Sequence, residues 1–264
     1  MNRIKGILYA AVSSSTFGLA PFFSITLLLA GFSASIVLIV FGWLSGCNFR
    51  LAGKDWGVVF LLSLLRAVTS FSLIIAYQNI ASGVASTIHF MYPLAVALAM
   101  MFFFREKKSL LVILAVLMSL LGAALLSLGE LEAKSGNTMV GLVAACVSVF
   151  SYAGYIVGVR TTRAVQINST ALTCYVMGLG TIFYLIGAYC TSGLQLVSDG
   201  YTWLIILGLA LPATAISNIT LVQAIKYAGP TLTSILGAME PLTAVVIGVF
   251  VFKELFTVNS AVGI

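Results

Sequence analysis

Charged side chains are scarce in this sequence. Its 264 residues include 13 Lys and Arg and 7 Asp and Glu, which together make up only 8% of the chain. A soluble domain carries about 25% charged residues, so this chain cannot cover a water-facing surface. The scarcity excludes a soluble enzyme, a nucleic-acid-binding domain and a disordered protein. Since 61% of the residues are hydrophobic and the mean hydropathy is +1.15, the sequence predicts a polytopic protein surrounded by lipid.

Histidine and cysteine are also rare. The single histidine excludes an HExxH zinc motif, and the four cysteines lie inside apolar runs without CxxC spacing. Neither a Walker loop nor a Gly-x-Ser-x-Gly motif is present. We therefore expect no metal, no cofactor and no enzymatic activity, and any energy for transport would come from an ion gradient.

Long apolar runs separated by polar breaks predict membrane-spanning helices. They are too long and too continuously apolar to be strands of a membrane barrel. The predicted spans are 6–30, 32–49, 56–77, 82–104, 109–128, 138–159, 168–190, 202–226 and 229–252, with a last segment from 257.

The basic residues of the loops predict an orientation. With alternating loops, we assign ten Lys and Arg to the side of the N-terminus: Arg3, Lys5, Arg50, Lys54, Arg105, Lys107, Lys108, Arg160, Arg163 and Lys253. Only Lys134 and Lys226 are assigned to the other side. Because cytoplasmic loops carry the excess of Lys and Arg, we expect a multi-pass inner-membrane protein with a cytoplasmic N-terminus.

The chain contains an internal repeat. A shift of 148 residues places residues 90–106, FMYPLAVALAMMFFFRE, on residues 238–254, AMEPLTAVVIGVFVFKE, with a mid-helix proline and a terminal basic–Glu pair in register. A shift of 135 places Gly6 on Gly141 and Phe17 on Tyr152. Because the matching helices are five spans apart, the two halves, residues 1–134 and 135–264, are inverted repeats, an architecture typical of transporters.

The repeat also predicts a length for each half. The first half is 13 residues shorter than the second near residue 33, and the tenth helix would run over 257–276. The fold class is therefore an all-α, ten-helix inverted repeat of five plus five helices, of which this sequence holds about nine and the start of the tenth. A natural nine-helix variant is the alternative.

The two proline blocks resemble the EamA-type transporters of the drug/metabolite transporter superfamily. The preceding segments AYQNIASGVAS (76–86) and AIKYAGPTLTS (224–234) fit the same pattern. The resemblance implies ten helices around a central cavity, cytoplasmic termini and export of a small molecule. The predicted second helix lacks the Arg that relatives often carry there.

Two ionisable residues stand within predicted spans. Arg66 and Glu240 each lie about 15–16 Å along a helix, near the middle of the bilayer. In one interpretation, Arg66 binds a carboxylate and Glu240 carries a proton or meets a cationic group. In the other, the two form a buried structural ion pair.

His89, Tyr92 and the two prolines form a second group of candidates. His89 shares a helix face with Tyr92 and Pro93, and is either a substrate contact or a hydrogen-bonded packing residue. Tyr92 and Glu240 immediately precede Pro93 and Pro241, which each remove a backbone donor and are candidate hinges. The prolines should free the carbonyls of His89 and Gly237, unless they only curve the helix.

Phe17, Tyr152 and Asn218 complete the candidate site, as cavity walls and a polar contact or as packing residues. The sequence thus predicts a secondary transporter for an amino acid or other carboxylate, with protons as the coupling ion. A membrane-embedded scaffold or channel-like protein and a lipid-modifying enzyme remain as alternatives.

Overall fold

The structure, a computed structural model, describes residues 2–17, 43, 49–106, 113–114, 117–118, 121, 136–191, 215–237, 239–240 and 243. All regular elements in these residues are helical, which confirms the all-α class. The predicted spans 32–49 and 109–128 and the last segment from 257 lie almost entirely outside the described residues.

The first part of the chain contributes five described elements: α1 (Asn2–Phe17), the short 3-10 helix η2 (Gly53–Asp55), α3 (Trp56–Asn79), α4 (Ser82–His89) and α5 (Tyr92–Phe103). The second part contributes α7 (Thr138–Thr161), the 3-10 helix η4 (Arg163–Gln166), α8 (Ser169–Thr191), α10 (Ser217–Ala228) and α11 (Pro230–Leu236). α3 and α7 agree with the predicted spans 56–77 and 138–159 to within two residues at each end.

Three helical stretches of the described chain are long and apolar enough to cross a membrane. They are Gly53–Asn79, Val84–Phe103 and Thr138–Thr161. Many large apolar side chains on them face outward, such as Phe103 and Phe150, which are 81% and 71% exposed. Surface of this kind suits lipid and not water, in agreement with the composition.

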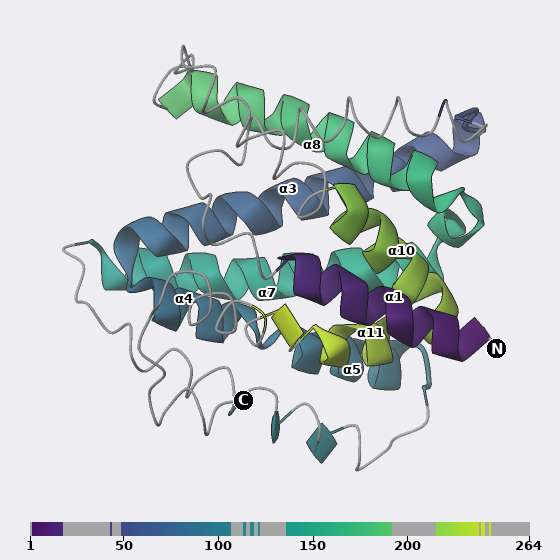
Figure 1. Cartoon of the computed structure of the whole chain (residues 1–264). Coiled ribbons are helices and arrows are strands. Elements are labelled where there is room, and N and C mark those ends of the chain that lie inside the picture. The colour runs from purple at the N-terminus through teal and green to yellow at the C-terminus, as the bar shows by residue number, and fades with distance from the viewer. Residues whose placement is uncertain are drawn as a thin grey trace.

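α3 and α7 pack side by side in antiparallel directions through the middle of the bundle (Figure 1). At one end, the backbone N–H of Asn137 donates to the Oδ1 atom of Asn79, the last residue of α3. Asn137 also caps α7, because its own Oδ1 accepts from the N–H groups of Met139 and Val140. A polar link therefore joins the end of α3 to the start of α7.

α1 and α10 form a second antiparallel pair (Figure 1). The Ser13 hydroxyl donates to the carbonyl of Ser217 and the Ser217 hydroxyl donates to the carbonyl of Ser13, both over 2.9 Å. Because both serines are buried and both satisfy a carbonyl on the other helix, this pair joins the helices without a large side chain between them.

The two helix pairs repeat the same close contact. A Cβ atom on Gly6 of α1 would lie 2.5 Å from the backbone nitrogen of Ala228, and one on Gly141 of α7 would lie 2.5 Å from Cγ2 of Ile80. The shift of 135 residues places Gly6 on Gly141, and the shift of 148 residues relates Ile80 to Ala228, so the two contacts occupy equivalent positions in the predicted repeat. The two shifts were found independently in the sequence, and the same pair of contacting positions satisfies both. This agreement supports the correspondence of α1 with α7 and of α10 with α3.

The predicted span 82–104 is interrupted. α4 ends at His89 and α5 begins at Tyr92, with Pro93 as its second residue. The N–H of Met91 donates to the carbonyl of Ile88, three residues back, as in a tighter turn. α11 likewise ends at Leu236, just before Gly237, the residue equivalent to His89. The two helices therefore end at positions that the predicted repeat makes nearly equivalent.

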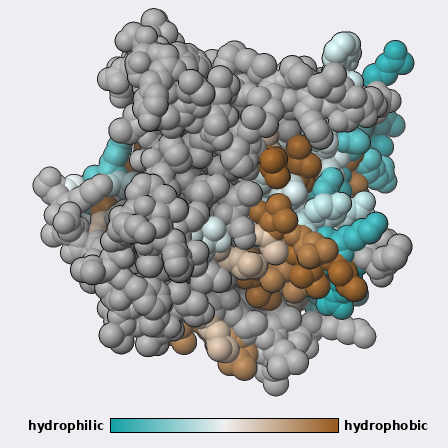
Figure 2. All heavy atoms as spheres, viewed as in Figure 1, coloured by the Kyte–Doolittle hydropathy of each residue, from teal (hydrophilic) through white to brown (hydrophobic). Residues whose placement is uncertain are grey.

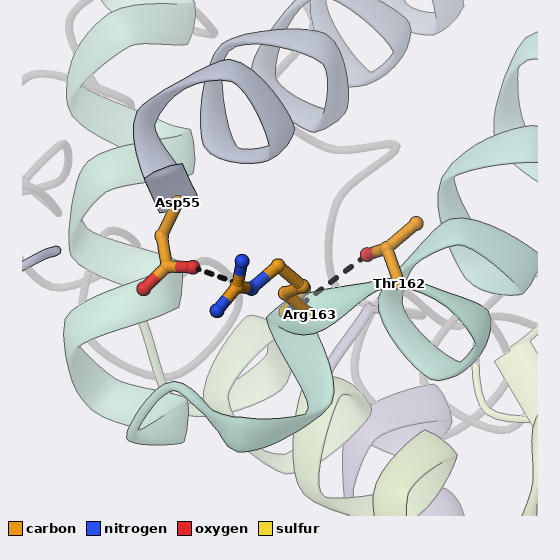
Figure 3. Close-up of polar contacts among 4 residues, drawn as sticks. Asp55, Thr162 and Arg163 are labelled. Carbon is orange, nitrogen blue, oxygen red and sulfur yellow. Dashed lines mark hydrogen bonds and ion pairs between the residues drawn. The ribbon is translucent and has the colours of Figure 1, made fainter. Parts of the chain in front are cut away.

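Basic side chains gather at one end of the bundle, which we call the basic end and define by Arg160, Arg163 and Lys226. Arg163 on η4 forms an ion pair of 3.3 Å with Asp55, at the start of α3 (Figure 3). Figure 2 shows hydrophilic residues on the right of the view, next to an apolar surface. The N-terminus lies on the same side in Figure 1.

The assignment of Lys226 to the side opposite Arg160 is wrong. The Lys226 side chain donates to the carbonyl of Ile167, and Arg160 donates to the carbonyl of Lys226 over 2.9 Å. The two residues therefore lie at the same end of the bundle. The physical reason is that α7 and α10 belong to the sixth and eighth predicted spans, which run in the same direction through the membrane.

Candidate functional site

Arg66 lies in the middle of α3 and faces α7. Its guanidinium carbon is 5.3 Å from the centroid of the Tyr152 ring, over the aromatic face. An arginine in this position is attracted by the negative face of the ring, by about 0.5–2 kcal/mol depending on how much water is excluded. Two residues predicted separately for the site, on helices of different halves, are thus brought into contact.

Three tyrosines surround this position, and we call Tyr92, Tyr152 and Tyr155 the tyrosine cluster. All three are buried, with exposed fractions of 3%, 7% and 1%. The rings of Tyr92 and Tyr152 are 4.7 Å apart in an edge-to-face arrangement, and those of Tyr152 and Tyr155 are 6.2 Å apart and nearly parallel. These geometries are favourable for aromatic pairs and hold the Tyr152 face in place under Arg66.

His89, the last residue of α4, borders the tyrosine cluster. Its ring centroid is 5.5 Å from that of Tyr92 and 5.4 Å from that of Tyr152. Its Nδ1 atom lies 3.0 Å from the hydroxyl of Ser148 on α7. His89 as a whole residue is half-buried. The hydrogen bond and the position beside the cluster fit both interpretations from the sequence.

Glu240 approaches the same place from the segment after α11. It lies close enough to Arg66, Tyr92 and Tyr152 to interact electrostatically with all three. Its backbone N–H donates to the carbonyl of Gly237 over 2.9 Å. The expectation that the carbonyl of Gly237 is left free by Pro241 is therefore wrong, because the tight turn supplies a donor from Glu240.

The hydroxyl of Tyr92 packs directly against Gly237, where a side chain would otherwise lie. A Cβ atom on Gly237 would lie 1.8 Å from the Tyr92 hydroxyl oxygen and 2.8 Å from the carbonyl of Ser234. Only a residue without a side chain allows this approach. The two equivalent helix breaks, one after His89 and one at Gly237, thus meet at Tyr92.

The other predicted residues are placed less fully. Asn218 is 2% exposed on α10, one turn before Leu221 and Val222, which pack in the same core as the tyrosines. Phe17 is the last residue of α1, and its side chain lies outside the described part of the chain, as does Pro241.

Two residues of the site were not singled out from the sequence. Ser148 contacts His89, and Tyr155 stacks on Tyr152. A signal for Tyr155 was present, because a residue three positions after Tyr152 shares its helix face. The shift of 135 residues places Ser13 on Ser148, but the neighbour of Ser148 across the helix interface depends on packing and has no signal in the sequence.

The site combines a guanidinium, a carboxylate, an imidazole and three phenols at mid-helix depth. Arginine offers a planar fork of donors that suits a carboxylate, and the Glu240 carboxylate can accept from an amine or carry a proton. Within the residues that the structure describes, no three His, Cys, Asp or Glu side chains lie together in an arrangement that would hold a metal ion.

Two comparisons with known proteins show similarity to transporters. Residues 139–264 match the model of the EamA-like transporter family. A relative described as an uncharacterized transporter from Archaeoglobus fulgidus is 27% identical over 234 residues, which are 88% of this chain and 82% of that protein. Both findings agree with the resemblance to EamA-type transporters, and the family match includes the second of the two proline blocks.

A crystal structure of another protein shares the fold. It matches with a TM-score of 0.80 at 18% sequence identity, over 99% of this chain and 92% of that chain. At this identity the likeness concerns the fold alone. It agrees with a polytopic helical protein.

Proposed function

We propose that this chain is a membrane transporter of the drug/metabolite transporter superfamily and carries a small organic metabolite across the cytoplasmic membrane. The match of residues 139–264 to the EamA-like transporter family and the similarity to a protein described as a transporter support this proposal. The substrate is an amino acid or a related carboxylate. It binds beside Arg66 and Glu240, with His89, Tyr92 and Tyr152 around it. The N-terminus lies in the cytoplasm and the direction of transport is export.

The observation that carries this proposal is the position of Arg66. A charged residue in the middle of a spanning helix is costly, by about 2.5–3.5 kcal/mol on insertion scales, and is kept where it faces a partner or a wet cavity. Here it stands over the Tyr152 face, within electrostatic reach of Glu240. This neighbourhood presents a cationic fork and an anionic group together, which complements the carboxylate and the ammonium of an amino acid.

The division of the proposed site between the two parts of the chain supports transport by alternating access. Arg66, His89 and Tyr92 belong to residues 1–134, and Tyr152 and Glu240 belong to residues 135–264. Any rocking of one half against the other changes the distances within the site. The helix breaks before Pro93 and at Gly237 are the hinges of this motion, because fewer helical hydrogen bonds resist bending there.

Substrate binding is tested by thermal stability of the purified protein with a panel of amino acids and carboxylates. We expect a carboxylate at 100 times its Kd to stabilise the parent by about 2.7 kcal/mol and Arg66→Ala not at all. Arg66→Lys, which keeps the charge and loses the fork, should show weaker stabilisation. If Arg66→Ala is destabilised but every ligand response is the same as in the parent, Arg66 is a structural residue of a scaffold.

Proton coupling is tested separately in liposomes. We expect uptake driven by an imposed pH gradient to be lost in Glu240→Gln, because the amide cannot exchange a proton, while exchange of substrate across the membrane without a gradient persists. Gradient-driven uptake at parental rates in Glu240→Gln would rule out Glu240 as the proton site. Transport that does not saturate with substrate would indicate a channel.

A further inference from the structure

His89 and Ser148 form a hydrogen bond whose direction can be worked out. The Nδ1 atom of His89 and the hydroxyl oxygen of Ser148 are 3.0 Å apart, and either atom could be the donor. The Ser148 hydroxyl is also 2.6 Å from the carbonyl of Ala145, to which it donates. Ser148 is completely buried, so no alternative partner from solvent is available to it.

A hydroxyl group has one proton, and a carbonyl can only accept. Because the Ser148 proton is directed at Ala145, the Ser148 oxygen has only lone pairs left for His89. The proton of the shared hydrogen bond must then belong to the imidazole. We infer that Ser148 is a positioning residue that holds His89 in the tautomer with its proton on Nδ1, so that Nε2 is a hydrogen-bond acceptor for the transported molecule.

The surroundings of the imidazole give this acceptor a role. His89 stands beside Tyr92 of α5 and Tyr152 of α7, and among the residues that the structure describes the charged groups near these rings are Arg66 of α3 and Glu240. Arginine only donates and a carboxylate only accepts. A bare Nε2 therefore adds an acceptor beside the tyrosine cluster, which suits a substrate with an N–H or O–H group, such as an amine or a hydroxyl.

This assignment of a ligand rests on the proposed transport function, but the tautomer does not. The sequence contains a single histidine, so protein labelled with 15N-histidine gives signals of His89 alone. Long-range proton–nitrogen correlation spectra of the full chain in detergent micelles or nanodiscs then show which ring nitrogen carries the proton. At about pH 8 free imidazole is neutral, and we expect a protonated Nδ1 and a bare Nε2.

The role of Ser148 is tested by Ser148→Ala, which removes the acceptor for Nδ1–H. We expect the proton to shift toward Nε2 in this variant. Ser151→Ala is the matched control, because Ser151 lies on the same helix one turn away. Its hydroxyl donates to the carbonyl of Val147, at 2.7 Å, and more weakly to the backbone carbonyl of Ser148, and it accepts from Thr69, so it has no contact with the Ser148 hydroxyl. It should leave the His89 signals unchanged. If Ser148→Ala does not fold, Ser148→Cys replaces it, since a thiol is a weaker acceptor and should give a partial shift.

Three results would overturn the inference. They are a proton on Nε2 in the parent, two protons on the ring at about pH 8, and an unchanged tautomer in a folded Ser148→Ala protein. These outcomes are independent of any substrate, so they leave the proposed function standing.

The ligand role is tested by transport. His89→Gln places an amide oxygen near the position of Nε2, whereas His89→Asn places its amide near Nδ1 and leaves the Nε2 position empty. We expect KM to stay near the parental value in His89→Gln and to rise roughly two- to tenfold in His89→Asn, with little change in kcat. Equal KM values in the two variants would contradict the acceptor role even if the tautomer is as inferred.

Discussion

Gly237 and Tyr92 offer a sharp test of how the two helix breaks fit together. In Gly237→Ala the added Cβ atom would lie 1.8 Å from the Tyr92 hydroxyl oxygen, far inside any allowed contact. The backbone of Gly237, with φ −56° and ψ −24°, is compatible with alanine. The substitution therefore introduces a steric conflict at Tyr92 and no backbone strain at position 237.

The magnitude follows from overpacking. Inserting a methyl group into a packed core costs about 1–3 kcal/mol, because a side chain or the backbone must move. Tyr92 is 3% exposed and packs edge to face on Tyr152, so it cannot rotate away without losing that contact. We expect Gly237→Ala to lie in the upper part of this range and to weaken substrate binding, because Tyr92 is displaced.

Tyr92→Phe should relieve the steric conflict, because it removes the hydroxyl oxygen that the added Cβ atom would meet. Removing the hydroxyl oxygen leaves the Cζ atom of the ring as the nearest side-chain atom, at 3.1 Å, and the carbonyl of Ser234 at 2.8 Å. The double variant should therefore recover about half of the loss, which gives a coupling energy of about 1 kcal/mol in a double-mutant cycle. Gly178→Ala is the control, since in the described part of the chain its added Cβ atom would meet no atom within 4 Å outside its own stretch of helix.

The cycle can be measured by thermal unfolding in detergent, monitored by size-exclusion chromatography, together with ligand-induced stabilisation. A loss of 1 kcal/mol corresponds to roughly 2–4 °C for a chain of this order of size. The reasoning is refuted if Gly237→Ala is as stable as Gly178→Ala, or if Tyr92→Phe gives no relief. Either result would mean that the Tyr92 hydroxyl does not lie against residue 237.

Two further comparisons test the packing of the bundle by the same unfolding assay. Gly6→Ala should destabilise more than Gly141→Ala, because the first Cβ atom meets backbone and the second meets the end of a side chain that can move; the reverse order would contradict the close α1–α10 contact. Thr231→Val should lose about 0.5–1.5 kcal/mol with the 2.6 Å hydrogen bond to Glu106, whereas Thr233→Val should be neutral or stabilising. The buried Thr233 hydroxyl has no hydrogen-bond partner in the described part of the chain, and a loss of stability in Thr233→Val would show that it has one.

Much of the candidate site could be predicted from the sequence because charge is so rare in this chain. Arg66 and Glu240 stand out in long apolar runs, and the structure brings them within electrostatic reach of each other. The interruption between α4 and α5 could also be predicted, since Pro93 cannot donate a helical hydrogen bond. These features were readable because each depends on one residue and its depth in a span.

The side of the membrane on which Lys226 lies could be derived from alternation but was assigned incorrectly. Its contacts with Arg160 and Ile167 place it at the basic end. The excess of basic residues on one side of the membrane predicts the same orientation even if one residue is assigned to the wrong side. A contact between two helices, in contrast, fixes the side on which an individual residue lies.

The sequence by itself determined that this is a helical membrane protein and predicted two related halves, because composition, run length and sequence self-similarity do not depend on packing. Only the tertiary structure decided that Tyr152 lies under Arg66, that Ser148 binds His89 and that Tyr92 rests on Gly237. The physical reason is that lipid-facing and core-facing positions are both apolar in a membrane helix. Polarity along the chain therefore does not reveal which face of α3 or α7 turns inward, and the neighbours of each side chain depend on the rotation and contact of the helices.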